Sequence, residues 1–430
     1  MKDNIQQNRL VPELRFAEFE NTDNGWNETK LIDVTDKNIK WSFIGGPFGS
    51  NLKSSDYVSK NNGVRIIQLQ NIGDGEFKND YKIFTSKEKA DELLSNNIYP
   101  GEIIMSKMGD PVGRACIIPD FHDRYVMGSD GIRIVVDENK YDKYFIYLLI
   151  NSKTFRTKVK NSSTGSTRKR IGLVVLKNLS FLVPQNKKEQ QKIANTLSSL
   201  DDLLQAETER LALLKEHKKG LLQQLFPKQG EKVPQLRFEE FVGDGDWEEK
   251  ELGDEDVAII IMGSSPKSSF YNENNIGLPL LQGNADIKNR LSTPRIFTSQ
   301  ITKECQIGDI LLSVRAPVGT VAKSLHKACI GRGISAIRAI KNNSQEYLYQ
   351  WLISFEPYWK NISQGGTFDA VNSDDIRKLH IPLPNPKEQQ KIADTLTSVD
   401  ELIAAQSKKI TALKEHKKGL MQGMFPKIKT

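Results

Sequence analysis

Cysteine and histidine are scarce in this chain of 430 residues, which contains three cysteines and five histidines. Cys116, Cys305 and Cys329 have no C-x-x-C spacing. This argues against a disulfide framework or a zinc site and favours a reducing, cytoplasmic environment. His217 and His416 are matching residues of a repeated KEHKK sequence, so a helix surface explains them better than metal ligation. The sequence predicts no metal site.

Long apolar runs are also absent. The longest, such as Val257–Met262 and Tyr144–Ile150, are far too short to span a bilayer. The first ten residues, MKDNIQQNRL, lack the apolar stretch of a signal peptide. Hydrophobic residues make up 38% and charged residues 27% of the chain, an ordinary soluble profile. We therefore expect a cytoplasmic protein with no membrane partner.

Sequence signatures of catalysis are missing. The chain has no Walker A loop for nucleotide phosphates, no Asn-Pro-Pro-aromatic run of the kind found in amino-methyltransferases, and no evident Ser/His/Asp or Cys/His arrangement. Gly45, Gly46 and Gly49 form a glycine-rich loop, which is more typical of a structural turn than of a phosphate cradle. Pro119-Asp120 and Glu138-Asn139-Lys140 resemble a PD…ExK nuclease motif, but the second half of the chain has no counterpart. We expect no catalytic residues.

The net charge is +7 and the sequence pI is about 9.0. This mildly basic balance favours an anionic partner such as nucleic acid. An ordinary solvated surface explains the same charge equally well.

Two helical segments of the chain are copies of one another. KEQQKIA ends at Ala194 and again at Ala393, an offset of 199 residues (393 − 194), and KEHKKGL and FPK recur at the same offset. Over residues 188–228 and 387–427, 25 of 41 positions are identical. A second repeat, VPELRFAEF at Val11–Phe19 and VPQLRFEEF at Val233–Phe241, opens each half. The chain therefore consists of two half-units.

The helical copies carry the heptad pattern of a coiled-coil seam. Asn186 and Asn385 each precede a glutamate by three residues, which is the spacing of a capping box. Gly220 and Gly419 are expected to bend or end the helices early. The predicted seam residues are Ile193, Leu197, Leu200, Leu204, Leu211, Leu214, Leu221, Ile392, Leu396, Val399, Ile403, Ile410, Leu413 and Leu420.

Polar residues interrupt both seams at the same two places: Glu207 and Lys218 in the first, Gln406 and Lys417 in the second. Because these interruptions match, we favour an antiparallel pair of the two helices over two helices packed only on their own domains. About 35 residues of such a pair would span roughly 50 Å and separate the two variable blocks.

The variable blocks are typical of an α+β fold. Strand-like runs include Val64–Leu69, Ile103–Ser106 and Ile310–Val314, and an aromatic helical stretch closes each block. Gly101–Ala115 matches Gly308–Ala322 with one gap, so the blocks are distant copies. We predict recognition domains at 1–184 and 229–383 and helical regions at 185–228 and 384–430, related by an internal pseudo-two-fold repeat.

Basic and amide side chains recur at matched places in both blocks. Arginine and lysine suit phosphates and guanine edges, whereas glutamine and asparagine suit adenine edges. Each of these residues alone is more typical of plain surface. The candidate DNA contacts are Lys53, Gln68, Gln70, Asn71, Lys107, Arg114, Arg168, Lys169, Arg170, Lys267, Gln282, Asn284, Arg315, Lys323 and Arg332.

On these repeats, the chain resembles the DNA-specificity subunits of type I restriction–modification enzymes. The resemblance covers nearly the whole chain and rests on the doubled KEQQKIA…KEHKKGL…FP segment and on the GE-I-I and GD-I-L elements of the two blocks. It implies two α/β target recognition domains, joined by an antiparallel coiled coil, that each read half of a split double-stranded DNA target. The family's DNA contacts vary with the target, so it adds no residues to the candidates.

The resemblance also implies partners. Two modification subunits would use S-adenosylmethionine to methylate adenine N6, and two motor-nuclease subunits would use ATP and Mg²⁺; this chain itself would hold no cofactor. The alternatives are the specificity region of a self-contained nuclease or methylase and a coiled-coil adaptor that does not bind DNA.

Overall fold

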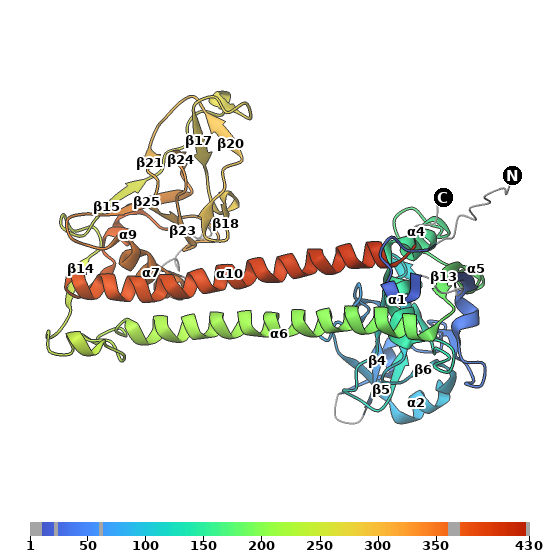
Figure 1. Cartoon of the computed structure of the whole chain (residues 1–430). Helices are drawn as coiled ribbons and strands as arrows, with labels where there is room; N and C mark the ends of the chain where they lie inside the picture. The colour runs from blue at the N-terminus through green and yellow to red at the C-terminus, as the bar shows by residue number, and fades with distance from the viewer. Residues whose placement is uncertain (1–10, 21–24, 60–62, 360–369, 427–430) are drawn as a thin grey trace. The chain divides into compact units, whose positions relative to one another are not determined.

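The computed structural model describes residues 11–20, 25–59, 63–359 and 370–426. The chain forms two compact units (Figure 1): unit 1 contains Met1–Ala206 and Ile410–Thr430, and unit 2 contains Glu207–Lys409. Each unit combines one variable block with a stretch of both long helices. No described helix is both long and apolar enough to cross a membrane.

Two sheets form the body of the variable block in unit 1. The first is antiparallel, in the order β2-β11-β7-β9, and the second has the order β3-β5-β4-β10-β6 with β4 and β10 parallel. Every side chain of β7 is buried, as expected for a continuous apolar run. The bounds are β2 Phe43–Gly45, β3 Tyr57–Val58, β4 Gly63–Ile67, β5 Ile83–Ser86, β6 Asn97–Ile98, β7 Ile103–Ser106, β9 Ala115–Ile117, β10 Tyr125–Met127 and β11 Gly131–Ile134.

Unit 2 repeats this arrangement. Its first sheet, β15-β25-β22-β23, is extended by β19 and β18, and its second sheet has the order β16-β20-β17-β24-β21 with β17 and β24 parallel. The equal strand order confirms that the blocks are copies of one fold. The bounds are β15 Ala258–Met262, β16 Tyr271–Asn272, β17 Leu278–Leu281, β18 Ile287–Lys288, β19 Leu291–Ser292, β20 Ile296–Thr298, β21 Glu304–Cys305, β22 Ile310–Ser313, β23 Val321–Lys323, β24 Ala328–Ile330 and β25 Ile334–Ala339.

The aromatic stretch near the end of each block is helical. In unit 1 it forms two helices, α3 (Lys143–Asn151) and α4 (Lys153–Asn161), because the Ser152 side chain accepts the N–H of Phe155 and starts a new helix. In unit 2 it forms α7 (Gln345–Phe355) and one 3-10 turn, η9 (Glu356–Tyr358). The α+β fold class is thereby confirmed.

Short elements complete each block. In unit 1, β8 pairs with β12, and β1 pairs with β13 directly before the first long helix; in unit 2, β14 pairs with β26 directly before the second. The bounds are α1 Ala17–Glu20, β1 Trp26–Lys30, α2 Lys87–Glu92, β8 Met108–Gly109, β12 Lys169–Arg170, α5 Leu173–Asn178, β13 Ser180–Pro184, β14 Glu248–Glu251, α9 Ser373–Arg377 and β26 His380–Leu383.

The two repeated segments are helices α6 (Lys187–Leu225) and α10 (Pro386–Met424), each of 39 residues. At 1.5 Å per residue, each is about 58 Å long. Asn385 caps α10 by accepting the N–H groups of Lys387 and Glu388, and each helix ends just before the expected proline. Gly220 and Gly419 lie inside the helices, which continue to Leu225 and Met424. The expectation that these glycines end the helices early is therefore wrong.

Each long helix contributes to both units. The core of unit 1 contains Ile193 and Leu197 from the start of α6 together with Met424 and Phe425 from the end of α10. The core of unit 2 contains the corresponding residues Ile392 and Leu396 with Leu225 and Phe226. The repeated FP sequence therefore anchors the end of each helix: Phe425 packs on Phe145 and Phe226 on Tyr347, with ring centroids 5.6 and 5.4 Å apart.

The predicted seam residues lie along one face of each helix. None of these residues is exposed, whereas most positions between them are. Within unit 2, Lys218 contacts Asp400 and Glu207 contacts Gln406, so residue numbers run in opposite directions and the pairing is antiparallel. Within unit 1, Lys417 contacts Asp201 in the same way. Each polar interruption of the seam is therefore satisfied by the opposite helix.

Candidate nucleic-acid interface

Loops from five places in the sequence meet at one end of the sheets in unit 1. Gly46 N–H donates to Gly131 O at 2.7 Å, Gly128 N–H to Ile67 O at 2.7 Å, and Lys107 N–H to Asp130 O at 2.9 Å. Ile171, directly after the 161–170 loop, donates to Lys107 O at 2.9 Å. We call this set of loops, residues 46–53, 68–70, 107, 128–130 and 164–170, the loop face of unit 1.

Glycine is required where these loops cross. A Cβ atom on Gly46 would lie 1.8 Å from the Gly128 carbonyl oxygen, and one on Gly263 would lie 2.2 Å from the Gly331 carbonyl oxygen in unit 2. No side chain fits at such distances. The glycine-rich loop therefore allows two backbone segments to pack closely. This agrees with the structural turn that the sequence favoured over a phosphate cradle.

Unit 2 builds the same face with different side chains. Gly263 N–H donates to Ile334 O at 3.0 Å, Gly331 N–H to Leu281 O at 2.8 Å, and Val314 N–H to Gly333 O at 3.0 Å. Arg332 N–H also donates to Ser265 Oγ at 3.1 Å. The loop face of unit 2 therefore contains residues 263–267, 282–284, 314–315 and 331–333.

The loop faces bring together most of the candidate contacts. Exposed cations are Lys53, Arg168 and Arg170 in unit 1 and Lys267, Arg315 and Arg332 in unit 2. Gln68, Lys107, Lys169, Gln282 and Asn284 are partly exposed, and Gln70 is exposed. These residues remain predicted DNA contacts. The loop Ile362–Asn372 of unit 2, which the sequence places as the counterpart of residues 161–170, lies largely outside the described residues.

Lys107 has the most distinctive electrostatic environment of the loop face in unit 1. Burial lowers its pKa, and the Arg170 guanidinium lowers it further, while the Asp130 carboxylate acts in the opposite direction. Asp130 also binds Arg170, with 3.0 Å between Oδ1 and Nη2. One carboxylate thus serves two cations, which leaves net positive charge for an anionic ligand.

Two candidates have structural roles instead and leave the predicted set. Asn71 is fully buried; its amide donates to the carbonyls of Lys78 and Tyr81 and its oxygen accepts from Gln68 N–H. Lys323 forms an ion pair with Glu346 on α7 and lies 4.4 Å from the Tyr349 ring centroid. Neither side chain is available to read a base.

The hairpin register shows that Lys323 is not the counterpart of Arg114. Ser106 N–H donates to Arg114 O in unit 1, and Ser313 N–H donates to Thr320 O in unit 2. Arg114 therefore corresponds to Thr320, while Lys323 lies three residues further along, at the end of β23. Arg114 is itself partly buried and points toward the Leu69 carbonyl, 3.5 Å away.

Phe48 is a residue of the loop face that the sequence argument missed. Its exposure, 82%, is the highest of any large hydrophobic residue in the described part of the chain. It lies between Gly46 and Gly49, and its carbonyl accepts the N–H of Asn51 at 2.9 Å. A phenylalanine held in water on a basic surface is suited to stack on or wedge between bases. An aromatic residue inside a glycine-rich loop was the available signal.

The structure offers no support for the nuclease-like motif. Among the described residues, no group of three or more His, Cys, Asp or Glu side chains is placed to hold a metal ion. Glu138 instead pairs with Lys143 at 3.2 Å, and Lys140 pairs with Asp137 at 3.3 Å. These contacts agree with the polar turn that the sequence favoured.

The repeated entry segments clamp the start of each long helix. Arg15 binds Glu189 through two contacts of 2.8 and 2.7 Å, and Arg237 binds Glu388 through two contacts of 2.9 Å. Both glutamate side chains are only 1% exposed. Sequence reasoning assigned these glutamates to capping boxes and missed the arginines, although all four residues are identical between the copies.

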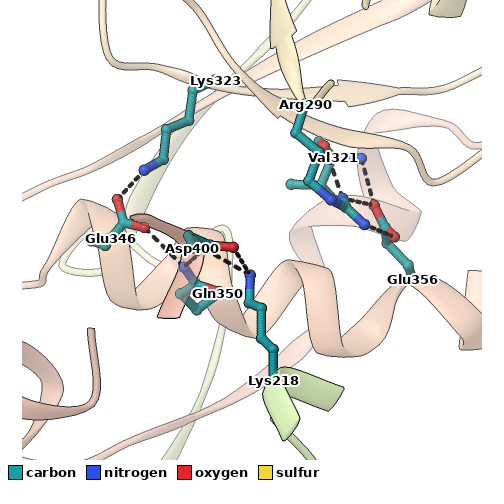
Figure 2. Close-up of polar contacts among 8 residues, drawn as sticks. All are labelled: Lys218, Arg290, Val321, Lys323, Glu346, Gln350, Glu356 and Asp400. Carbon is teal, nitrogen blue, oxygen red and sulfur yellow. Dashed lines mark hydrogen bonds and ion pairs between the residues drawn. The ribbon is translucent and has the colours of Figure 1, made fainter. Parts of the chain in front are cut away.

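A polar network in unit 2 joins the helix pair to the recognition domain (Figure 2). Lys218 Nζ lies 2.7 Å from both oxygens of Asp400, and Gln350 on α7 donates to Asp400 at 2.9 Å and to Glu346 at 3.1 Å. Burial lowers the pKa of Lys218, and Asp400 opposes this shift. In unit 1, Asp201 accepts from Tyr144 at 2.5 Å and pairs with Lys417. Lys218 and Lys417 therefore each pair with an aspartate that also contacts the recognition domain of its unit.

Comparison with known proteins agrees with this architecture. The family model for the type I restriction modification DNA specificity domain matches residues 52–216 and 244–415. A putative type I restriction enzyme MjaX specificity subunit from Methanocaldococcus jannaschii is 30% identical over 84% of this chain and 85% of its own. The MjaIX specificity subunit from the same organism is 29% identical over 42% of this chain and 44% of its own.

Two solved structures share the fold. A chain from a study of complex assembly and conformational transition of the type I R-M system matches with a TM-score of 0.61 and 23% identity, covering 94% of this chain and 98% of that one. The S subunit of a type I system from M. genitalium matches with a TM-score of 0.59 and 17% identity, covering 97% and 100%.

The family model matches the chain twice, once in each half, and each match includes most of a recognition block and most of a long helix. The chain therefore belongs to the type I restriction–modification DNA specificity family, as a specificity subunit with two target recognition domains.

Proposed function

We propose that this chain selects the DNA target of a type I restriction–modification complex, each recognition domain reading one half of a bipartite double-stranded site. The observation that carries the proposal is the pair of loop faces. The same backbone crossings hold both, yet they present different side chains: Lys107, Arg170 and Phe48 in unit 1, against Arg315, Arg332 and Lys267 in unit 2. Two unlike faces of one fold suit two unlike half-sites.

In this proposal the helix pair α6 and α10 sets the spacer between the half-sites. A buried seam and paired polar interruptions make a stiff element with a defined register. The helix pair also docks two modification subunits, which supply S-adenosylmethionine and methylate adenine N6. Two motor-nuclease subunits join for restriction and use ATP and Mg²⁺.

A division of labour between subunits is chemically sensible. An enzyme that modifies adenine N6 must take the base out of the stack. A partner without a cofactor can choose that base by holding the DNA on both sides of it. In the proposal, the cations of the loop faces bind phosphates and fix the register, and the amide side chains of Gln68 and Gln282 contact base edges.

Methylation assays with and without partner subunits test this function. The purified chain alone should transfer no methyl group to plasmid DNA, and addition of the modification subunits should produce N6-methyladenine at one bipartite sequence. Methyl transfer by the chain alone would instead support a self-contained methylase.

Binding measurements test the third possibility, a coiled-coil adaptor. The chain with its modification subunits should bind DNA with an affinity that falls as salt rises and should leave a sequence-dependent footprint. Binding that is absent at low salt would exclude a DNA-reading role.

A further inference from the structure

Glu207 of α6 contacts Gln406 of α10, and these two residues are repeat equivalents, offset by the same 199 residues (406 − 207) as the rest of the repeat. Gln406 Nε2 donates to Glu207 Oε2 at 2.5 Å and to Glu207 O at 2.8 Å. Lys409 Nζ lies 2.6 Å from Glu207 Oε1. Glu207 and Gln406 are 8% and 7% exposed. At this buried position of the seam, each helix therefore contacts the equivalent position of the other helix, and the two residues differ.

The rest of the seam does not distinguish a helix from its copy. Ile193 and Ile392, Leu197 and Leu396, and the other seam pairs are apolar on both helices. Lys218 pairs with Asp400 and Lys417 with Asp201, and because each residue is identical to its repeat equivalent, α6 facing a second α6 would retain the same ion pairs. Arg210 and Lys409, also equivalents, are both cations.

We infer that the Glu207–Gln406 pair makes α6 choose α10 of the same chain over the like helix of a second copy of this chain. If two chains exchanged halves, two Glu–Gln pairs would become one Glu–Glu pair and one Gln–Gln pair. The first apposes two buried carboxylates, which is unfavourable, and the second loses the ion pair with Lys409. Unlike residues at the seam position thus favour pairing of unlike helices, as polar seam residues do in coiled coils generally.

The same pair fixes the register of the helices. A shift of one heptad would move Glu207 from Gln406 to Val399 or Leu413, where a buried carboxylate would have no polar partner on the seam. If the proposed function holds, this matters for reading: exchanged halves would join two identical recognition domains, and such a dimer would read a symmetric site in place of a bipartite asymmetric one.

The cost of exchange can be measured in the intact chain without DNA or partner subunits, so its result is independent of the proposed function. Q406E reproduces the Glu–Glu pair, and E207Q reproduces the Gln–Gln pair. The double variant E207Q/Q406E reverses the pair, and Arg210 then takes the place of Lys409 beside the carboxylate. A404E, at an exposed position of α10, adds the same charge as Q406E and is the matched control.

Thermal unfolding, followed by circular dichroism at pH 7.5, measures the Tm of each variant. Q406E should lower Tm by about 3 °C or more, E207Q by less, and A404E by less than about 1 °C. The double variant should recover at least half of the Q406E loss. The Q406E deficit should shrink as pH falls toward about 4.3. A carboxyl facing another carboxylate has a raised folded-state pKa, so the penalty is relieved below the unfolded value and grows as pH rises.

In the wild-type chain the pKa of the seam carboxyl group is shifted in the opposite direction. The Lys409 ammonium and the Gln406 amide lower the pKa of Glu207, with a smaller contribution from Arg210. Its stabilisation is lost as pH falls, which also narrows the gap between wild type and Q406E. The inference is overturned if the two single variants together lose no Tm, or if the double variant recovers less than half. Should Q406E not fold, a folded double variant supports the inference and an unfolded one overturns it.

Discussion

Replacing Arg237 by methionine should strongly destabilise unit 2. The Arg237 side chain is 11% exposed and makes two contacts of 2.9 Å to Glu388, whose side chain is 1% exposed at the start of α10. It also donates to the Gly245 carbonyl at 2.6 Å. Its loss leaves a buried carboxylate without its cation. Breaking a buried ion pair from one side costs about 3–5 kcal/mol.

That loss corresponds to a fall in Tm of about 6–20 °C for a domain of this size. Differential scanning calorimetry at pH 7.5 measures it directly. Arg15→Met should have the same effect on unit 1, where Arg15 clamps Glu189.

The double variant Arg237→Met/Glu388→Met is the control. Removal of both charges leaves no buried ion, so its stability should return to within about 1–2 kcal/mol of the wild type. A fall in Tm of less than about 2 °C for Arg237→Met, or a double variant no more stable than the single one, would refute the role of the entry segment as a clamp.

Three further predictions concern DNA. Arg168→Ala and Arg170→Ala should each reduce the salt dependence of DNA binding by about one phosphate contact, measured by fluorescence anisotropy, whereas Lys323→Ala should leave it unchanged. Phe48→Ala should weaken DNA binding by about 1–3 kcal/mol without lowering Tm, because the side chain is 82% exposed; unchanged affinity would remove Phe48 from the interface. One heptad added to both helices beside the Glu207–Gln406 pair should lengthen the spacer of the methylated site by about three base pairs, since seven residues rise about 10 Å and B-DNA rises about 3.4 Å per base pair. An unchanged spacer would contradict the proposal that the helix pair sets the spacer length.

The sequence predicts the long helices well because their signal is local and doubled. Heptad spacing, the asparagine caps and the flanking prolines all lie within the segments themselves. The glycines at 220 and 419 misled the prediction because helix packing outweighs a local propensity of about 1 kcal/mol.

The entry-segment clamps and the loop faces were predicted less well, because their geometry depends on residues far apart in the chain. Arg15 and Glu189 lie 174 positions apart, and no local pattern joins them. Asn71 looked like a base contact because its amide partners, the carbonyls of Lys78 and Tyr81, come from a loop whose path the sequence does not show. Lys323 looked like a DNA contact because the sequence does not show that α7 lies beside the end of β23, where Glu346 pairs with the lysine.

The most direct test of the account is an exchange of one recognition domain. The chain would be reconstituted with modification subunits after its second block, residues 251–381, is replaced by the equivalent block of another specificity subunit, and the N6-methyladenine products would be sequenced. The account predicts that one half-site changes while the other half-site remains the same. A change in both half-sites, or in neither, would contradict the claim that each recognition domain reads its own half of the target.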